Sequence, residues 1–446
     1  MENDKSQALS IKKSLLYRLP FASYAKKILR KLINLLLPRP TTKQLKLSLE
    51  AVQKENLLLS EIVNAFISTV GNNTNIASAL LGNSESCKIA VDEIAGLLNW
   101  PEILNENKRC NGFNELIRLH NMFSSSDDNI DHSSNCWVLL AAKNCDQLLE
   151  HGYNNFKRTI GHNYFNFLVQ KGDSQILAVE SLFPQTVIET CRQAAHAMPH
   201  DPTFNTQEQF SYFYFIFLLW EYVKKIDRKH YLEQLEEPSE GNPLLVSLNG
   251  KNMSQDLANS LIEYYSMSEA VNFSSVKKIL EIGGGYGRNA HVILSLNPKA
   301  RIFLVDILPA IYIAQRYLSS IFPHRKVFKA RNFSSFANIQ NEIEESSIIF
   351  LLPHQLALIP DDYFDLSINI SSFGEMKLEQ IGWYFSQINR ITRGHFYMKQ
   401  WDASQNPFDD LILKKSDYPC PEQWKEIYSR QCVIQTDFFE TIYQVN

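Results

Sequence analysis

The chain places an acidic residue and four glycines in one short stretch. Glu281 is followed by Gly283, Gly284, Gly285 and Gly287 within "ILEIGGGYGR". Glycine adopts backbone conformations that other residues avoid, and it lets a loop approach a neighbouring group closely. The chain has only 16 glycines in 446 residues. Their concentration here therefore predicts a loop that lies against a ligand.

The charge at this loop discriminates between two kinds of ligand. Gly285-Tyr-Gly287-Arg-Asn-Ala290 would fit a dinucleotide fingerprint, with Asp306 as the ribose-binding acid. However, Glu281 at the end of the preceding apolar run would repel a pyrophosphate held on the next helix. It would instead attract a ligand with a positively charged amine. S-adenosylmethionine carries an ammonium and a sulfonium and has no phosphate, and Asp306 would bind its ribose hydroxyls. The structural alternative is a tight turn with Asp306 as a helix cap.

The elements around the loop predict an α/β fold. Strands are expected at 277–283, 300–306, 347–353, 363–371 and 395–401, with an antiparallel pair at 432–436 and 438–445. Helices are expected at 287–296, 308–321 and 377–391. Strands that alternate with helices of this length predict a Rossmann-like, doubly wound, mostly parallel sheet. Ligands of such sheets bind at the carboxyl ends of the strands.

The residues before this region differ from it in charge and in predicted secondary structure. Residues 1–40 form a basic segment, with an amphipathic helix and Pro38 and Pro40 at its end. Such a helix either lies on an anionic membrane or packs on the protein. Residues 41–240 predict a large all-α region, with helices at 136–148, 156–170, 185–197 and 206–232. The turn-rich stretch 236–243 is the predicted boundary to the α/β domain, residues 241–446.

Composition excludes several classes of protein. The formal net charge is −4, so the chain has no bulk attraction to nucleic acid. The seven cysteines are scattered without a CxxC pair, which argues against a disulfide framework and for a reducing compartment. No apolar run is long enough to span a membrane. We expect a cytoplasmic protein without a zinc site, and metal catalysis through Asp361 and Asp362 is only a minor option. Peripheral contact with the inner membrane face through residues 12–37 is an open alternative.

The loop and the segments around it resemble a known family. The loop resembles motif I of class I S-adenosylmethionine-dependent methyltransferases. Residues from about 150 onwards are similar to the bacterial sugar O-methyltransferases. The similarity lies in the ordered blocks "GYNNFKRTIGHNYFNFLV", "GNPLLVSLNGKNMSQDLANSLIEYY", "ILEIGGGYGR", "VDILPAIYIAQRYL", "LLPHQLALIPDDYFDLSINISSFGEM" and "HFYMKQW". The resemblance implies a sheet of the class I methyltransferase type and a sugar or glycan acceptor.

The resemblance also suggests further site residues. It implies that Ile307, His354 and Gln355 contact the cofactor, the last two at its adenine. Transfer to a hydroxyl needs a general base, and Glu375 in "SSFGEM" is our first choice. His354 is a second candidate base, because imidazole titrates near neutrality. Lys399 could orient the acceptor or neutralise an oxyanion. The structural alternatives are a helix-opening Glu375, a structural His354 and a solvated strand end at Lys399.

Three functions follow from these patterns. The leading hypothesis is methyl transfer to a sugar hydroxyl in surface polysaccharide or glycolipid biosynthesis. The second keeps the cofactor but has a phenol or another small-molecule hydroxyl as acceptor. The third is a catalytically silent scaffold at a membrane surface. The helical region is expected to cap the sheet, shape the acceptor site or mediate a homodimer.

Overall fold

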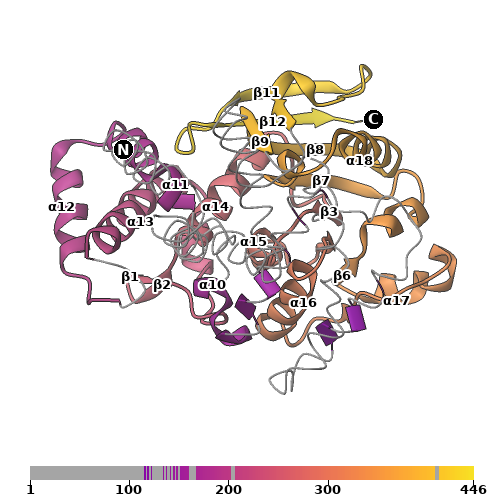
Figure 1. The fold of residues 1–446 in the computed structure, drawn as a ribbon, viewed down its shortest axis with the longest axis horizontal. Helices are drawn as coiled ribbons and strands as arrows, with labels where there is room; N and C mark the ends of the chain where they lie inside the picture. Colours follow the sequence, from indigo (N-terminus) through magenta and orange to yellow (C-terminus); the bar gives the residue numbers. More distant parts are fainter. Residues whose placement is uncertain are drawn as a thin grey trace, which may run out of the picture. The chain divides into compact units, whose positions relative to one another are not determined.

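The central feature is an eight-stranded sheet in the order β11-β12-β8-β7-β3-β4-β6-β5 (Figure 1). A computed structural model describes residues 151–159, 167–201, 206–406 and 411–445, with isolated positions between 115 and 148. The strands of the sheet are β3 (Lys278–Ile282), β4 (Arg301–Val305), β5 (Val327–Phe328), β6 (Ile348–Leu351), β7 (Phe364–Ile370), β8 (Thr392–Trp401), β11 (Lys425–Gln431) and β12 (Phe438–Gln444). Five neighbouring pairs are parallel, and β12 runs antiparallel to both β8 and β11.

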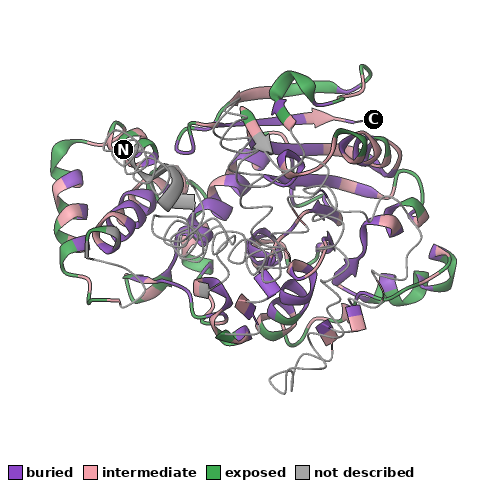
Figure 2. Ribbon diagram, viewed as in Figure 1, coloured by how far each residue is buried: buried purple, intermediate pink, exposed green. Residues whose placement is uncertain are grey.

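Helices cover both faces of this sheet. The helices are α14 (Gln255–Ser268), α15 (Arg288–Leu296), α16 (Ala310–Ile321), α17 (Gln340–Glu345) and α18 (Leu378–Ile391). One buried cluster joins α14, α15 and α16 to one face, through residues such as Ile279 and Ile368. A second cluster joins α17 and α18 to the other face, through residues such as Leu280 and Phe396. Figure 2 shows the central strands as buried. The structure thus confirms the predicted doubly wound, mostly parallel sheet.

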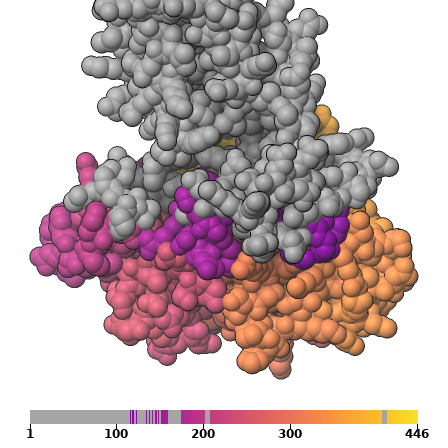
Figure 3. All heavy atoms as spheres, turned by 60° about the horizontal axis from the view of Figure 1, so that its bottom comes forward, coloured from indigo at the N-terminus to yellow at the C-terminus, as the bar shows by residue number. Residues whose placement is uncertain are grey.

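The described helices before the sheet share its first cluster. They are α10 (Phe156–Thr159), α11 (Phe167–Glu180), α12 (Gln185–His196) and α13 (Thr206–Ile226). Short 3-10 turns lie at Tyr153–Asn155 and Tyr231–Gln234, and a small hairpin consists of β1 (Val246–Leu248) and β2 (Lys251–Met253). Residues of α13, including Trp220 and Val223, belong to the same buried cluster as Ile279 of β3. Figure 3 shows the surface of these helices beside that of the residues leading into the sheet.

Several predicted boundaries need correction. The helix expected at 206–232 ends at Ile226, and the one expected at 156–170 is replaced by α10 and by α11, which continues to Glu180. The stretch 432–436 is the connection between β11 and β12, because the strand pairing with β12 is Lys425–Gln431. A further hairpin, β9 (Ala403–Asn406) and β10 (Leu411–Lys414), was not expected. Further 3-10 turns lie at Phe336–Asn338, Pro353–Leu358, Phe373–Glu375 and Lys415–Asp417.

Other predictions fall where the structure gives no description. The basic segment 1–40 and residues 41–114 lie outside the described residues. The described residues all belong to one compact unit, and the predicted boundary at 236–243 lies within it. In the described part of the chain, no helix combines the length and the apolar character needed to cross a bilayer.

Candidate active site

The glycine loop is closely packed against other parts of the protein. Gly283, Gly285 and Gly287 have φ angles of 69°, 57° and 92°, a region in which glycine is favoured. A Cβ on Gly283 would overlap the Ser372 hydroxyl, and one on Gly287 would lie 2.9 Å from a methyl group of Leu318. A Cβ on Gly284 would approach Leu304 and Glu281. The glycines therefore serve the contact between the loop and its own fold, whereas the leading interpretation of the sequence was contact with a ligand.

We predict that Gly283→Ala destabilises the folded protein by about 1–3 kcal/mol or more, because it combines a strained φ with overlap on Ser372. Gly382 in α18 provides the matched control, since a Cβ there meets nothing within 4 Å. Gly382→Ala should stabilise the protein by about 0.5–1 kcal/mol, as expected in a helix interior. Urea unfolding of both variants measures the difference. Equal stability of the two variants would contradict this account of the loop.

Glu281 lies at the carboxyl end of β3 and is almost fully buried. Its Oε1 accepts a hydrogen bond of 3.2 Å from the Asn289 side chain of α15. Its Oε2 has no hydrogen-bond partner among the described residues. Burial raises the pKa of Glu281 to about 7, against the opposing effects of Asn289 and the charge of Arg288. A buried oxygen without a donor is costly unless a ligand supplies one, so Glu281 fits a ligand with a positively charged or N–H group.

Asp306 follows β4 directly and holds the loop in place. One carboxylate oxygen accepts a hydrogen bond of 2.7 Å from the Gly285 amide, and the other accepts one of 2.7 Å from the Ile307 amide. Burial raises the pKa of Asp306 to about 7. Each carboxylate oxygen can accept more than one hydrogen bond, so both retain capacity for ribose hydroxyls. The alternative of a helix cap is wrong in detail, since α16 begins only at Ala310 and is preceded by Pro309.

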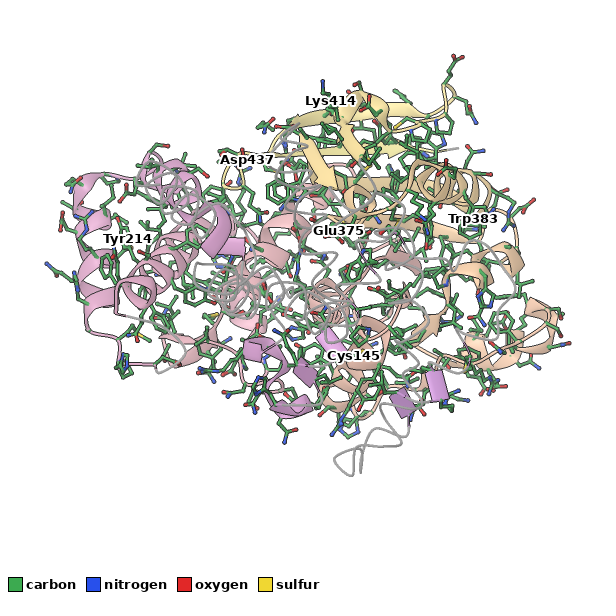
Figure 4. All side chains as sticks on the ribbon, in the orientation of Figure 1. Cys145, Tyr214, Glu375, Trp383, Lys414 and Asp437 are labelled. Carbon is green, nitrogen blue, oxygen red and sulfur yellow. The ribbon has the colours of Figure 1, made fainter. Side chains whose placement is uncertain are left out.

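Glu375 follows β7 in the 3-10 turn Phe373–Glu375 (Figure 4). The side chain is half-buried. Burial and then the charge of Asp306 raise the pKa of Glu375 to about 8. The alternative role of opening the next helix does not hold, because α18 begins at Leu378 with Lys377 as its N-cap and Gln380 closing the turn.

Three carboxyl groups therefore meet at the carboxyl edge of the sheet. Glu281 lies at the end of β3, and Asp306 and Glu375 follow β4 and β7, the two strands that flank β3. The charge of Asp306 contributes to the raised pKa of both Glu281 and Glu375, so the three groups share one electrostatic environment. The strand order reverses between the adjacent strands β3 and β7, and open α/β sheets bind ligands at such a point. Such a cluster is suited to a cationic ligand.

The segment after β6 carries the predicted adenine contacts. Gln355 is buried, and its amide is used within the protein: Oε1 accepts from the Leu352 amide at 2.9 Å and Nε2 donates to the Arg331 carbonyl at 2.7 Å. Gln355 thus closes its own 3-10 turn, which the sequence did not lead us to expect. His354 is half-buried in the same turn, and Ile307 is half-buried after Asp306. Roles of these three residues in cofactor binding remain predictions.

Lys399 is buried, so the alternative of a solvated strand end is wrong. Its Nζ donates to Glu263 Oε1 at 2.8 Å and also to Gln435. Glu263 in turn accepts from Arg288 of α15 at 2.6 Å and 3.2 Å. Burial alone would lower the pKa of Lys399, but the charge of Glu263 outweighs it and raises that pKa. Within the described residues, Lys399 belongs to an ion-pair network that ties β8 to α14 and α15. Its predicted contact with an acceptor remains a prediction.

Aromatic side chains can stack on a sugar ring, and β8 carries two such residues in Tyr397 and Trp401. Tyr397 is fully buried, and its hydroxyl donates to Glu440 at 2.8 Å, so it belongs to the core. Trp401 is half-buried at the strand end, with its ring centroid 4.2 Å from that of Phe438.

Sequence reasoning missed several residues that position the site. Asn289 binds Glu281, and Ser372 lies against Gly283. Tyr286, inside the glycine loop, donates to Asp256 of α14 at 2.6 Å. Buried Lys157 of α10 pairs with Glu237, and its Nζ lies 5.0 Å from the Tyr286 ring centroid. The one signal in the sequence is the segment "SQDLANS", residues 254–260. It has more polar residues than a buried helix usually has, which indicates that they make contacts inside the protein.

No group of three or more histidine, cysteine, aspartate or glutamate side chains in the described part of the chain is arranged to hold a metal ion. Asp361, one of the two acids considered as oxygen ligands, pairs instead with Arg390 at 2.8 Å.

Comparisons with known proteins give structural neighbours only. No protein-family model matches the chain, and no curated protein does. An S-adenosylmethionine-dependent methyltransferase from Clostridium acetobutylicum is 12% identical, with a TM-score of 0.29, over 43% of this chain and 92% of its own. Geranyl diphosphate C-methyltransferase from Streptomyces coelicolor is 10% identical, with a TM-score of 0.32, over 42% of this chain and 80% of its own. Both matches cover less than half of this chain, so the function proposed below rests on the residues of the site.

Proposed function

We propose that the protein is an S-adenosylmethionine-dependent O-methyltransferase that acts on a sugar hydroxyl. The observation that carries this proposal is the meeting of Glu281, Asp306 and Glu375 at the switch point of the sheet, around the glycine loop. The sugar as acceptor rests on the family resemblance of the blocks that contain Glu375 and Lys399. Surface polysaccharide or glycolipid is the proposed destination of that sugar.

Glu281 and Asp306 would bind different parts of the cofactor. The unpartnered Oε2 of Glu281 would accept a hydrogen bond from the ammonium group of the cofactor. Asp306 would bind the ribose hydroxyls while it holds Gly285 and Ile307 in place. When bound, S-adenosylmethionine supplies a methyl group activated by its sulfonium.

Glu375 is the proposed general base. It follows β7 at the same edge of the sheet as Asp306, whose charge contributes to its raised pKa. It would take the proton of that hydroxyl as the oxygen becomes nucleophilic. A carboxylate with a raised pKa is the stronger base, so burial improves its driving force for proton transfer.

Calorimetry should show S-adenosylmethionine binding with proton release. In the free protein burial raises the pKa of Glu281 and of Asp306 to about 7, so both carry protons part of the time at neutral pH. A cationic ligand favours the ionised form and lowers these pKa values. We expect the release of about half a proton to one proton per site at pH 7, measured as a dependence of the binding enthalpy on the ionisation enthalpy of the buffer.

Glu281→Gln is the diagnostic variant, because it keeps the oxygen that Asn289 contacts and removes the charge. It should weaken S-adenosylmethionine binding by about tenfold to a hundredfold and reduce the proton release. Glu379 on the exposed start of α18 gives the control, and Glu379→Gln should change neither quantity. Binding of NAD with no binding of S-adenosylmethionine would contradict the proposed cofactor.

A further inference from the structure

The first turn of α14 contains a buried amide without a partner. Gln255 has no exposed surface, and neither Oε1 nor Nε2 of its side chain makes a hydrogen bond with any described residue. The neighbouring Asp256 is also buried, and its Oδ1 has no partner in the part of the chain that the structure describes. Buried polar groups in folded proteins are nearly always paired, so each exception calls for an explanation. Two adjacent exceptions on one helix turn point to a missing ligand.

This turn is tied to the glycine loop. Asp256 Oδ2 accepts a hydrogen bond of 2.6 Å from Tyr286, which lies between Gly285 and Gly287. The N-cap of the helix is Ser254, whose hydroxyl accepts from the Leu257 amide at 3.0 Å. The helix is therefore capped by its own residue, and the unpartnered groups are additional to the cap. Their link to Tyr286 places them beside the proposed cofactor site.

The unpartnered groups define the chemistry of a ligand. The amide of Gln255 both donates and accepts, and Oδ1 of Asp256 accepts while it is ionised. An anion would be repelled by Asp256, and an apolar group would leave the amide unpaired. Burial raises the pKa of Asp256 to about 6, against the charge of Arg288 and the Tyr286 hydrogen bond, so it is ionised at pH 7. A neutral ligand with two or more hydroxyl groups satisfies both side chains, because each hydroxyl donates and accepts.

We propose that Gln255 and Asp256 bind two hydroxyl groups of the acceptor, which makes the first turn of α14 the sugar-recognition site. This proposal rests on the function proposed above and adds the residues that select the acceptor. The site is covered by α13, whose Trp220 donates to the Ser254 carbonyl at 3.2 Å. The contacts over this turn must therefore open to admit an acceptor, and their closure would keep water away from it.

Gln255→Met tests the proposal, because it keeps the length of the side chain and removes the amide. With no ligand the variant should melt about 1–3 °C higher, since an unpaired buried polar group is lost. The probes are methyl α-D-glucoside, methyl α-D-mannoside and methyl α-L-rhamnoside. Saturation-transfer NMR measures their binding. We expect at least one to bind the wild type, and its dissociation constant to rise tenfold or more in the variant. The dissociation constant of S-adenosylmethionine should stay within twofold.

Gln315 in α16 is the matched control. It is buried too, but its Nε2 donates to Glu115 at 2.9 Å and its Oε1 accepts from the Ala330 amide at 2.9 Å. Gln315→Met should therefore melt lower than the wild type and bind the glycosides unchanged. Opposite thermal shifts of the two variants would show that Gln255 is the glutamine without a structural partner.

Each other outcome overturns the proposal. Gln255→Met that binds the probe as the wild type does would mean that Gln255 has no part in acceptor recognition. A loss of S-adenosylmethionine affinity with unchanged glycoside affinity would assign the turn to the cofactor. A wild type that binds S-adenosylmethionine but none of the glycosides would reject a sugar site and leave the proposed cofactor intact. Glycoside binding is measured in the absence of S-adenosylmethionine. A failure to bind the cofactor is therefore distinguished from a failure to bind the glycoside.

Discussion

Glu263→Gln is expected to destabilise the folded protein by about 3–5 kcal/mol, which is the effect of removing one partner from a buried ion pair. Glu263 is almost fully buried and lies between two buried cations, with Oε2 2.6 Å from Arg288 and Oε1 2.8 Å from Lys399. The glutamine cannot compensate either charge, and its NH2 group would face a donor. Chemical denaturation at pH 7 measures the loss.

The exposed ion pair of Arg331 and Glu342 gives the matched control. Its side chains are 44% and 51% exposed, so Glu342→Gln should cost less than about 1 kcal/mol. A similar small loss for Glu263→Gln would show that water or other groups compensate the two buried cations. That result would mean that the network contributes little to holding β8, α14 and α15 together.

The same network predicts a pH dependence. Burial alone would raise the pKa of Glu263, but the charges of Arg288 and Lys399 outweigh it and lower that pKa to about 2. The unfolded chain has the ordinary pKa of glutamate, about 4.3. The stabilisation is therefore fully present above about pH 4.3 and is lost as the pH falls towards 2. In Glu263→Gln this part of the acid destabilisation should be absent.

The sequence predicts local features of this protein well. The strand before the glycine loop, the loop itself and α15 all lie where the pattern places them, because each depends on neighbouring residues. Glu281 and Asp306 were found for the same reason, since each stands at the end of an apolar strand. The carboxyl ends of parallel strands meet at one edge, so their convergence follows from the topology.

Contacts between distant parts of the chain could not be predicted in this way. Glu263 and Lys399 are separated by 136 positions, and Lys157 and Glu237 by 80. Neither pair leaves a periodic signal, because each position is a single charged residue in an otherwise ordinary segment. Lys399 was therefore assigned to the acceptor, with a solvated strand end as the alternative, and its pairing with Glu263 was not expected. The stretch 432–436 was similarly misassigned, because its apolar residues pack in a connection whose buried members include Cys432 and Ile434.

Glu375→Gln is expected to lower kcat by about a hundredfold to ten-thousandfold, the usual contribution of a general base. The variant keeps the shape of the side chain and loses the group that accepts the proton. Burial and then the charge of Asp306 raise the pKa of Glu375 to about 8 in the free protein, and only the ionised form is a base. The kcat/KM of the wild type should therefore rise with pH and level off above about pH 8.

Two measurements distinguish a base from a residue that only shapes the site. Transfer of labelled methyl groups to the acceptor gives the pH profile, which in Glu375→Gln should lose its rise towards pH 8. Calorimetry gives the affinity for S-adenosylmethionine, which should be unchanged or slightly reduced, because removing one carboxylate weakens the attraction of the cluster for a cation. A variant with normal kcat would exclude Glu375 as the base. His354 would then be the group to replace, since it is the other candidate at this edge of the sheet.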